Sequence, residues 1–123
     1  MSGNAVSWFE IYVQDMSRAR AFYEKVFSRT LERLASGDLE MWAFQGVMEK
    51  YGTGGALVRN AAVPSGGNSI VVYFECDDCA VEGARVPGAG GRLLKEKFPI
   101  GQYGFIVLAY DTEGNLIGLH SMK

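Results

Sequence analysis

The segment SWFEIYVQDMSRARAFYEKVF (residues 7–27) constrains the fold most, because a strand pattern passes there directly into a capped helix. Residues 8–13 alternate between an apolar face (Phe9, Ile11, Val13) and a mixed face (Trp8, Glu10, Tyr12), which predicts a strand buried on one side. Asp15 stands where a helix N-cap belongs. Apolar residues then recur at helical spacing, at Met16, Ala19, Phe22, Val26 and Phe27. We therefore expect a strand followed at once by a helix.

The rest of the chain extends this order and then repeats it. Three short strands are predicted at 30–35, 39–46 and 52–60, before the linker 61–69. A strand at 69–78 and a short helix at 79–86, stopped by Pro87, begin the second half, and strands at 91–98, 103–111 and 115–121 complete it. Setting Asp15 on Asp78 places Trp8, Glu10 and Tyr12 over Val71, Tyr73 and Glu75. We predict one α+β domain, residues 1–123, of two β-α-β-β-β modules at about 6–60 and 69–122.

Several sequence motifs, together with the order of the predicted elements, resemble those of a known protein family. The stretches VQDMSRARAFYEKVF, GGALV, PIGQYGF and DTEGNLIGLHS, within two β-α-β-β-β modules, resemble the vicinal oxygen chelate superfamily. This superfamily contains glyoxalase I, extradiol dioxygenases, fosfomycin resistance enzymes and bleomycin resistance proteins. The resemblance runs from about Trp8 to Ser121. It implies that each module curls a mixed sheet around half of a cavity, and that two modules, often from two chains, complete a site. We expect a homodimer.

The metal positions of the family's enzymes carry no metal ligands in this sequence. The resemblance would put ligands at Trp8 and Val71 on the first strand of each module, at Gly118 on the last strand, and within GTGGALV (residues 52–58). A divalent cation needs several oxygen or nitrogen ligands at about 2 to 2.5 Å. We therefore predict no metal and no cofactor. A displaced metal site formed by Glu10, Glu75 and His120 stays open as the alternative, and with it a lyase, isomerase or dioxygenase activity.

Carboxylates interleaved with aromatic rings favour a different use of the cavity. Charge pairing, together with cation-π attraction of roughly 0.5 to 2 kcal/mol per ring, would hold an organic cation. The resemblance is thus closest to the metal-free, drug-binding branch of the family. We predict a small-molecule binding protein whose ligand is cationic or aromatic, with a collapsed interaction module as a further alternative. The candidate ligand-binding residues are Trp8, Glu10, Tyr12, Trp42, Tyr73, Glu75 and His120, and His120 is also the candidate acid or base.

Net charge and the length of the apolar runs indicate which classes of partner are excluded. The formal net charge of -2 and the absence of a basic stripe argue against nucleic acid. The apolar runs fall short of the roughly 20 residues of a membrane helix, and the start MSGNAVSW lacks a leader pattern, so we expect a cytoplasmic protein with no membrane partner. The two cysteines, Cys76 and Cys79, have a Cys-x-x-Cys spacing, but the aspartates between them disfavour thiolates. We expect two ordinary thiols. The helix arginines Arg18 and Arg20 are expected to face solvent.

Overall fold

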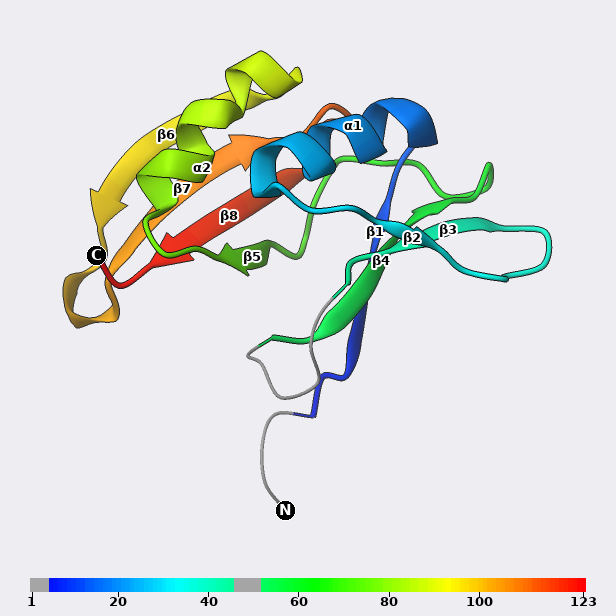
Figure 1. Ribbon diagram of the computed structural model, residues 1–123, viewed down its shortest axis with the longest axis horizontal. Helices are drawn as coiled ribbons and strands as arrows, with labels where there is room; N and C mark the ends of the chain where they lie inside the picture. Colours follow the sequence, from blue (N-terminus) through cyan, green and yellow to red (C-terminus); the bar gives the residue numbers. More distant parts are fainter. Residues whose placement is uncertain (1–4, 46–51) are drawn as a thin grey trace.

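The computed structural model describes residues 5–45 and 52–123, and within them the chain forms two four-stranded sheets with two α-helices (Figure 1). The predicted order of strands and helices is confirmed in both halves; the end of the predicted strand 39–46 lies outside the described residues. The first half comprises β1 (Trp8–Tyr12), α1 (Met16–Phe27), β2 (Glu32–Arg33), β3 (Glu40–Ala43) and β4 (Gly54–Arg59). The second half comprises β5 (Val72–Glu75), α2 (Cys79–Arg85), the short 3-10 helices η1 (Pro87–Ala89) and η2 (Gly101–Tyr103), β6 (Arg92–Pro99), β7 (Phe105–Tyr110) and β8 (Leu116–Ser121).

The two sheets have the same topology. Sheet A has the strand order β1-β4-β3-β2 and sheet B the order β5-β8-β7-β6, so β1 and β5 are edge strands. In each sheet the first and last strands of the half pair in parallel, and the other pairs are antiparallel. Mixed sheets of this kind are what the two predicted β-α-β-β-β units require, since a helix links the first strand to the rest.

Aspartates cap both helices as the sequence predicts. The Asp15 side chain accepts a hydrogen bond from the backbone N–H of Arg18 at 3.0 Å, and the Asp78 side chain accepts one from Ala80 at 3.0 Å. Each cap satisfies one of the free N–H groups at a helix start, which makes the boundary readable from a local signal. Helix α1 ends at Ser28, whose φ of 52° lies in the left-handed region.

The apolar core joins the two halves. One cluster of buried residues combines β1, α1 and β4 with Val86, which caps the end of α2, and with residues from β7 and β8. Helices α1 and α2 lie next to each other on the same side of the strands (Figure 1). Where the halves meet, Phe9, Phe27, Phe44 and Phe74 pack with ring centroids 4.5 to 6.4 Å apart, and we call these four residues the phenylalanine seam. Neither half buries its apolar face alone.

The turn before β8 holds the first half through Glu113. The carboxylate of Glu113 accepts hydrogen bonds from the backbone N–H groups of Gln14 and Asp15, each at 2.9 Å, and from the hydroxyl of Thr112 at 2.9 Å. Arg18 pairs with it through Nε at 2.7 Å and through a second guanidinium nitrogen at 2.8 Å. These donors lower the pKa of Glu113 to about 2, although burial opposes them. The turn therefore fixes the junction between β1 and α1.

Asp111 and Asn115, in the same turn, form further hydrogen bonds within it and to the first half of the chain. Asp111 accepts hydrogen bonds from the hydroxyl of buried Tyr23 at 2.6 Å and from the backbone N–H groups of Glu113 and Asn115, each at 2.8 Å. Burial and the neighbouring Asp111 raise the pKa of Tyr23 well above its usual value. Asn115 donates to the carbonyl of Tyr12 at 3.0 Å, across 103 residues of sequence. A buried polar network with its partners in place specifies one arrangement of the two halves.

The expectation that the arginines of α1 face solvent is confirmed for Arg18, whose side chain is 52% exposed, but not for Arg20, whose side chain is 29% exposed. Both arginines also contact other elements. Arg18 is bound to Glu113, as described above, and Arg20 lies over the ring of Trp42, with its guanidinium carbon 3.5 Å from the ring centroid. Helical spacing places both arginines outside the apolar stripe of α1. At these positions Arg18 contacts the turn before β8, and Arg20 contacts sheet A. Within the described residues, no helix is both long and apolar enough to cross a membrane.

Candidate ligand-binding site

Each sheet has a helix face, turned toward α1 or α2, and an open face on the other side. On the open face of sheet A, Glu10 is flanked by two aromatic residues of the same strand. Trp8 Nε1 donates to Glu10 Oε2 at 3.2 Å, and the Tyr12 hydroxyl donates to Glu10 Oε1 at 2.7 Å. This hydrogen bond is the main cause of the raised pKa of Tyr12. Among the described residues no lysine, arginine or histidine forms an ion pair with Glu10, so these two neutral donors leave its charge uncompensated.

Trp42 lies on the opposite face of the same sheet. It pairs in register with buried Leu57 of β4 and is covered by Arg20, while its Nε1 donates to Glu40 at 3.0 Å. Residues paired across a ladder point to the same face, so Trp42 shares the helix face with Leu57. The grouping of Trp42 with Trp8 and Tyr12 as walls of one site is therefore wrong, and Trp42 supports α1 instead.

On the open face of sheet B, Glu75 and His120 are register partners and form a close pair. His120 Nδ1 lies 2.7 Å from Glu75 Oε1, and His120 Nε2 lies 2.6 Å from the carbonyl oxygen of Tyr103 in η2. A carbonyl oxygen only accepts, so Nε2–H donates to Tyr103, and a carboxylate oxygen of Glu75 accepts a hydrogen bond from Nδ1–H when that nitrogen also carries a proton. Both contacts raise the pKa of His120, the Tyr103 carbonyl first and Glu75 second. In its protonated form His120 therefore has both N–H groups engaged.

The ring of Tyr73 covers Gly118, one of the positions where the family's enzymes would carry a metal ligand. Tyr73 and Gly118 are register partners, and a Cβ built on Gly118 would clash with carbon atoms of the Tyr73 ring. Trp8 and Gly54 form the same kind of pair in sheet A, where a Cβ on Gly54 would lie 3.3 Å from the Trp8 ring. Both rings are about half exposed, at 50% for Tyr73 and 43% for Trp8. One ring face lies on glycine and the other is open.

The enzymes of this fold family bind a divalent metal ion. The residues at the corresponding positions of this chain do not fit such an ion. The ring of Tyr73 fills the space over Gly118, and neither Trp8 nor Val71 offers a metal ligand. Within residues 5–45 and 52–123, no group of three or more His, Cys, Asp or Glu side chains is placed to hold a metal ion. The alternative site of Glu10, Glu75 and His120 is therefore not assembled in one chain.

A large open groove runs along the edge strand β5. It measures about 1830 Å³ and is lined on one side by the phenylalanine seam and on the other by the open face of sheet B. Three of the candidate residues from the sequence line it, namely Tyr73, Glu75 and His120, whereas Trp8, Glu10, Tyr12 and Trp42 do not. Sequence reasoning missed Phe9, Phe27 and Phe74 as lining residues, because their spacing signals a core face. Arg29 and Asp77 add charge at the groove.

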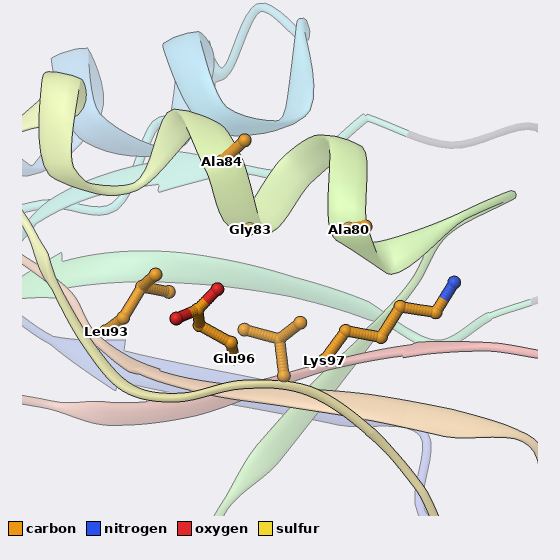
Figure 2. A pocket seen from close by; sticks show the side chains of 7 residues that line it. Ala80, Gly83, Ala84, Leu93, Glu96 and Lys97 are labelled. Atoms are coloured by element: carbon orange, nitrogen blue, oxygen red, sulfur yellow. The ribbon is translucent and has the colours of Figure 1, made fainter.

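A second hollow lies between α2 and the strands β6 and β7. It measures about 90 Å³, and Figure 2 shows Leu93, Glu96 and Lys97 beneath the small residues Ala80, Gly83 and Ala84 of the helix. Lys97 is engaged there in an ion pair with Asp78 at 2.8 Å. Sites for organic ligands are typically about 300 to 1,000 Å³, so this hollow is too small for one. Its lining residue Glu96 provides a control substitution away from the large groove.

Cys76 and Cys79 are free, buried thiols. Burial is the largest cause of the rise in the pKa of Cys76 to about 12, and the neighbouring Glu82 adds to it. A thiol reacts as its thiolate, so Cys76 is unreactive at neutral pH. The expectation of two ordinary thiols is confirmed.

Comparisons with known proteins agree with this fold. A family model described as the Glyoxalase/Bleomycin resistance protein/Dioxygenase superfamily matches residues 5–119. A search of curated protein sequences found no match.

Solved structures are similar over nearly the whole chain. Hypothetical protein SA1046 from S. aureus is 17% identical with a TM-score of 0.74, over 98% of this chain and 95% of that one. TnmS3, an antibiotic binding protein from Streptomyces sp. CB03234, is 23% identical with a TM-score of 0.68, over 98% of both chains. Glyoxalase I from Zea mays is 22% identical with a TM-score of 0.74, but the match covers 94% of this chain and 45% of that one.

At such identities the structural likeness shows the fold alone, whereas the family model spans both modules. The predicted resemblance to the vicinal oxygen chelate group is thereby confirmed, and the chain belongs to the Glyoxalase/Bleomycin resistance protein/Dioxygenase superfamily.

Proposed function

We propose that this protein binds a small aromatic molecule, preferably an organic cation, in the groove beside β5, and that it does so without a metal ion. The observation that carries the proposal is the lining of the groove, where six aromatic side chains line the same space as Glu75 and His120: Phe9, Phe27, Phe44, Tyr73, Phe74 and Tyr103. Apolar and aromatic walls with few polar groups are typical of small-molecule sites.

Tyr73 is the side chain best placed to contact such a ligand. One face of its ring lies on Gly118 and cannot collapse further, so the exposed face offers a flat, supported surface beside Glu75 on the same strand. A ring and a carboxylate at this spacing favour a cation that carries an aromatic group. A binding role has a precedent in this fold, since the structural neighbour TnmS3 is an antibiotic binding protein.

We further propose that the protein acts as a homodimer. The edge strands β1 and β5 have a free side in sheets A and B, and exposed apolar residues lie along or beside them: Val6, Trp8, Ile70 and Tyr73. Unpaired edges of this kind favour association. In such a dimer the open face with Trp8, Glu10 and Tyr12 would close the groove of the partner. The two free thiols support a reducing compartment such as the cytoplasm.

Calorimetric titration with benzyltrimethylammonium chloride tests the binding function, since this probe combines a ring with a permanent charge. We expect saturable binding by chelator-treated protein at pH 8, unchanged by added zinc. Tyr73→Ala should weaken it by roughly tenfold, because one ring contact is worth about 0.5 to 2 kcal/mol. Glu96→Gln, in the second hollow, should leave it unchanged. An absence of binding, or equal affinity in the Tyr73→Ala variant, would refute the proposal.

A further inference from the structure

We propose that an organic cation binds at Glu75 in exchange for the proton of His120, so that each cation bound releases one proton to the solvent. The inference rests on the proposed binding function and adds to it a coupling between cation binding and the protonation of His120. It makes cation affinity depend on pH through a single side chain.

The geometry of His120 carries this inference. Its two ring nitrogens face two acceptors, Glu75 Oε1 at 2.7 Å and the Tyr103 carbonyl oxygen at 2.6 Å. A neutral imidazole has one donor nitrogen and satisfies one acceptor only, so both contacts are hydrogen bonds to these acceptors when the ring is charged. The Glu75–His120 pair is therefore neutral overall while His120 keeps both protons.

The groups around His120 leave Glu75 as its main charged neighbour. From β5 come Glu75 and the phenol-bearing Tyr73, from η2 comes Tyr103, and from β7 the register partner is apolar Ile106. Asp77 and Arg29 line the same groove. Within the described residues Glu75 is the one carboxylate that forms an ion pair with His120. The charge of the ring thus sets the charge that Glu75 presents to the groove.

A second cation at Glu75 would lie next to the imidazolium. Like charges a few ångströms apart disfavour each other, so the bound cation favours the neutral ring, and the neutral ring favours the cation by the same factor. The Tyr103 carbonyl and Glu75 raise the pKa of His120 above its ordinary value, so the protonated ring persists to higher pH than a free imidazole does. In the limit where only the neutral ring admits the cation, affinity falls about tenfold for each pH unit below the pKa of His120.

The test is calorimetric titration of the full chain with benzyltrimethylammonium between pH 5.5 and 8.5, in phosphate and in buffers of high ionisation enthalpy. The charge of this probe does not change with pH. We expect tighter binding as pH rises, and release of close to one proton per cation at the acidic end. His120→Gln keeps a donor for Glu75 but cannot titrate, so its affinity should be high and constant with pH. Glu96→Gln should behave like the wild type.

Proton NMR gives a readout that needs no variant, because His120 is the only histidine of the chain. Saturating benzyltrimethylammonium should lower the pKa that its ring protons report, while neutral benzyl alcohol should not. Binding that is equally tight at pH 6 and pH 8, with no proton released and no change in the His120 titration, would overturn this inference and leave the groove function standing. An absence of binding at every pH would overturn both.

Discussion

The two ends of β8 carry two carboxylate sites that differ in almost every respect. At the turn that leads into β8, the Glu113 side chain is fully buried and accepts five hydrogen bonds from four residues. Toward the other end, the Glu75 side chain is 43% exposed, and among the described residues His120 is its one ion-pair partner. The first site has no capacity left for a ligand, whereas the second has open lone pairs. Stability is thus concentrated at one end of the strand and binding capacity at the other.

Glu113→Gln should give the largest effect in this comparison. The amide keeps one acceptor oxygen but puts an N–H group among donors and leaves Arg18 without its countercharge, so the free energy of unfolding should fall by about 2 to 4 kcal/mol. Urea denaturation measures this change. Glu96→Gln should stay within about 0.5 kcal/mol of the wild type. Similar losses in the two variants would mean that Glu113 has no special role.

Acid should remove the same contribution reversibly. Glu113 has a pKa of about 2 in the folded chain against an ordinary value of 4.5. Its contribution is therefore fully present above about pH 4.5 and is lost as pH falls toward 2, by at most about 3 kcal/mol. Denaturation curves at pH 5.5, 4 and 3 should show the wild type losing stability more steeply than Glu113→Gln. Parallel losses in both proteins would place the acid sensitivity elsewhere.

Gly118→Ala tests how tightly Tyr73 is supported near the binding end. The new methyl group would clash with the Tyr73 ring, so the ring must move, at a cost of roughly 1 to 2 kcal/mol in the free energy of unfolding. The double variant with Tyr73→Ala should recover most of this loss, because the obstacle is then absent. Additive losses in the double-mutant cycle would show that the strain arises from the backbone and not from the ring.

Glu10→Gln should separate binding from stability on sheet A. The substitution keeps one acceptor oxygen, for Trp8 or for Tyr12, and because the face is exposed, water can replace the other partner, so the free energy of unfolding should change by less than about 0.5 kcal/mol. If the partner chain brings this face to the groove, affinity for benzyltrimethylammonium should fall by about fivefold, as loss of one exposed charge pair predicts. Unchanged affinity would exclude Glu10 from the site.

The smallest expected effect is the contribution of His120 to folding. Its pKa is raised in the folded chain, so its stabilisation is present below about pH 6.5 and is lost as pH rises through the raised value. Because the pair with Glu75 is partly exposed, the change should be under about 1 kcal/mol. Thermal unfolding at pH 6 and 8.5, compared with His120→Gln, measures it. A larger loss on the alkaline side would mark His120 as a structural residue.

Local signals account for what could be predicted. Asp15 and Asp78 were recognisable as caps because a cap acts within three residues, and alternation placed Glu75 and His120 on one face because the period of a strand is two. Family motifs supplied the module order. Each of these signals is contained in a short window or in a fixed repeat.

Long-range contacts account for what could not be predicted. The face of Trp42 depends on the register between β3 and β4, and a shift of one residue would reverse it. The role of Glu113 depends on backbone N–H groups 98 and 99 residues away, and the contact between His120 and Tyr103 depends on how η2 folds back. No local pattern in DTEGN or PIGQYGF encodes those partners.

The two buried thiols have a consequence for kinetics. Cys76 and Cys79 lie between β5 and α2, beside the groove but on the helix face of sheet B, where reagents do not reach them in the closed structure. Their rate of modification by a small alkylating reagent therefore counts how often this part of the molecule opens. The modification rate therefore reports local opening of the second half of the chain. A ligand bound along β5 should lower that rate without contacting either sulfur atom.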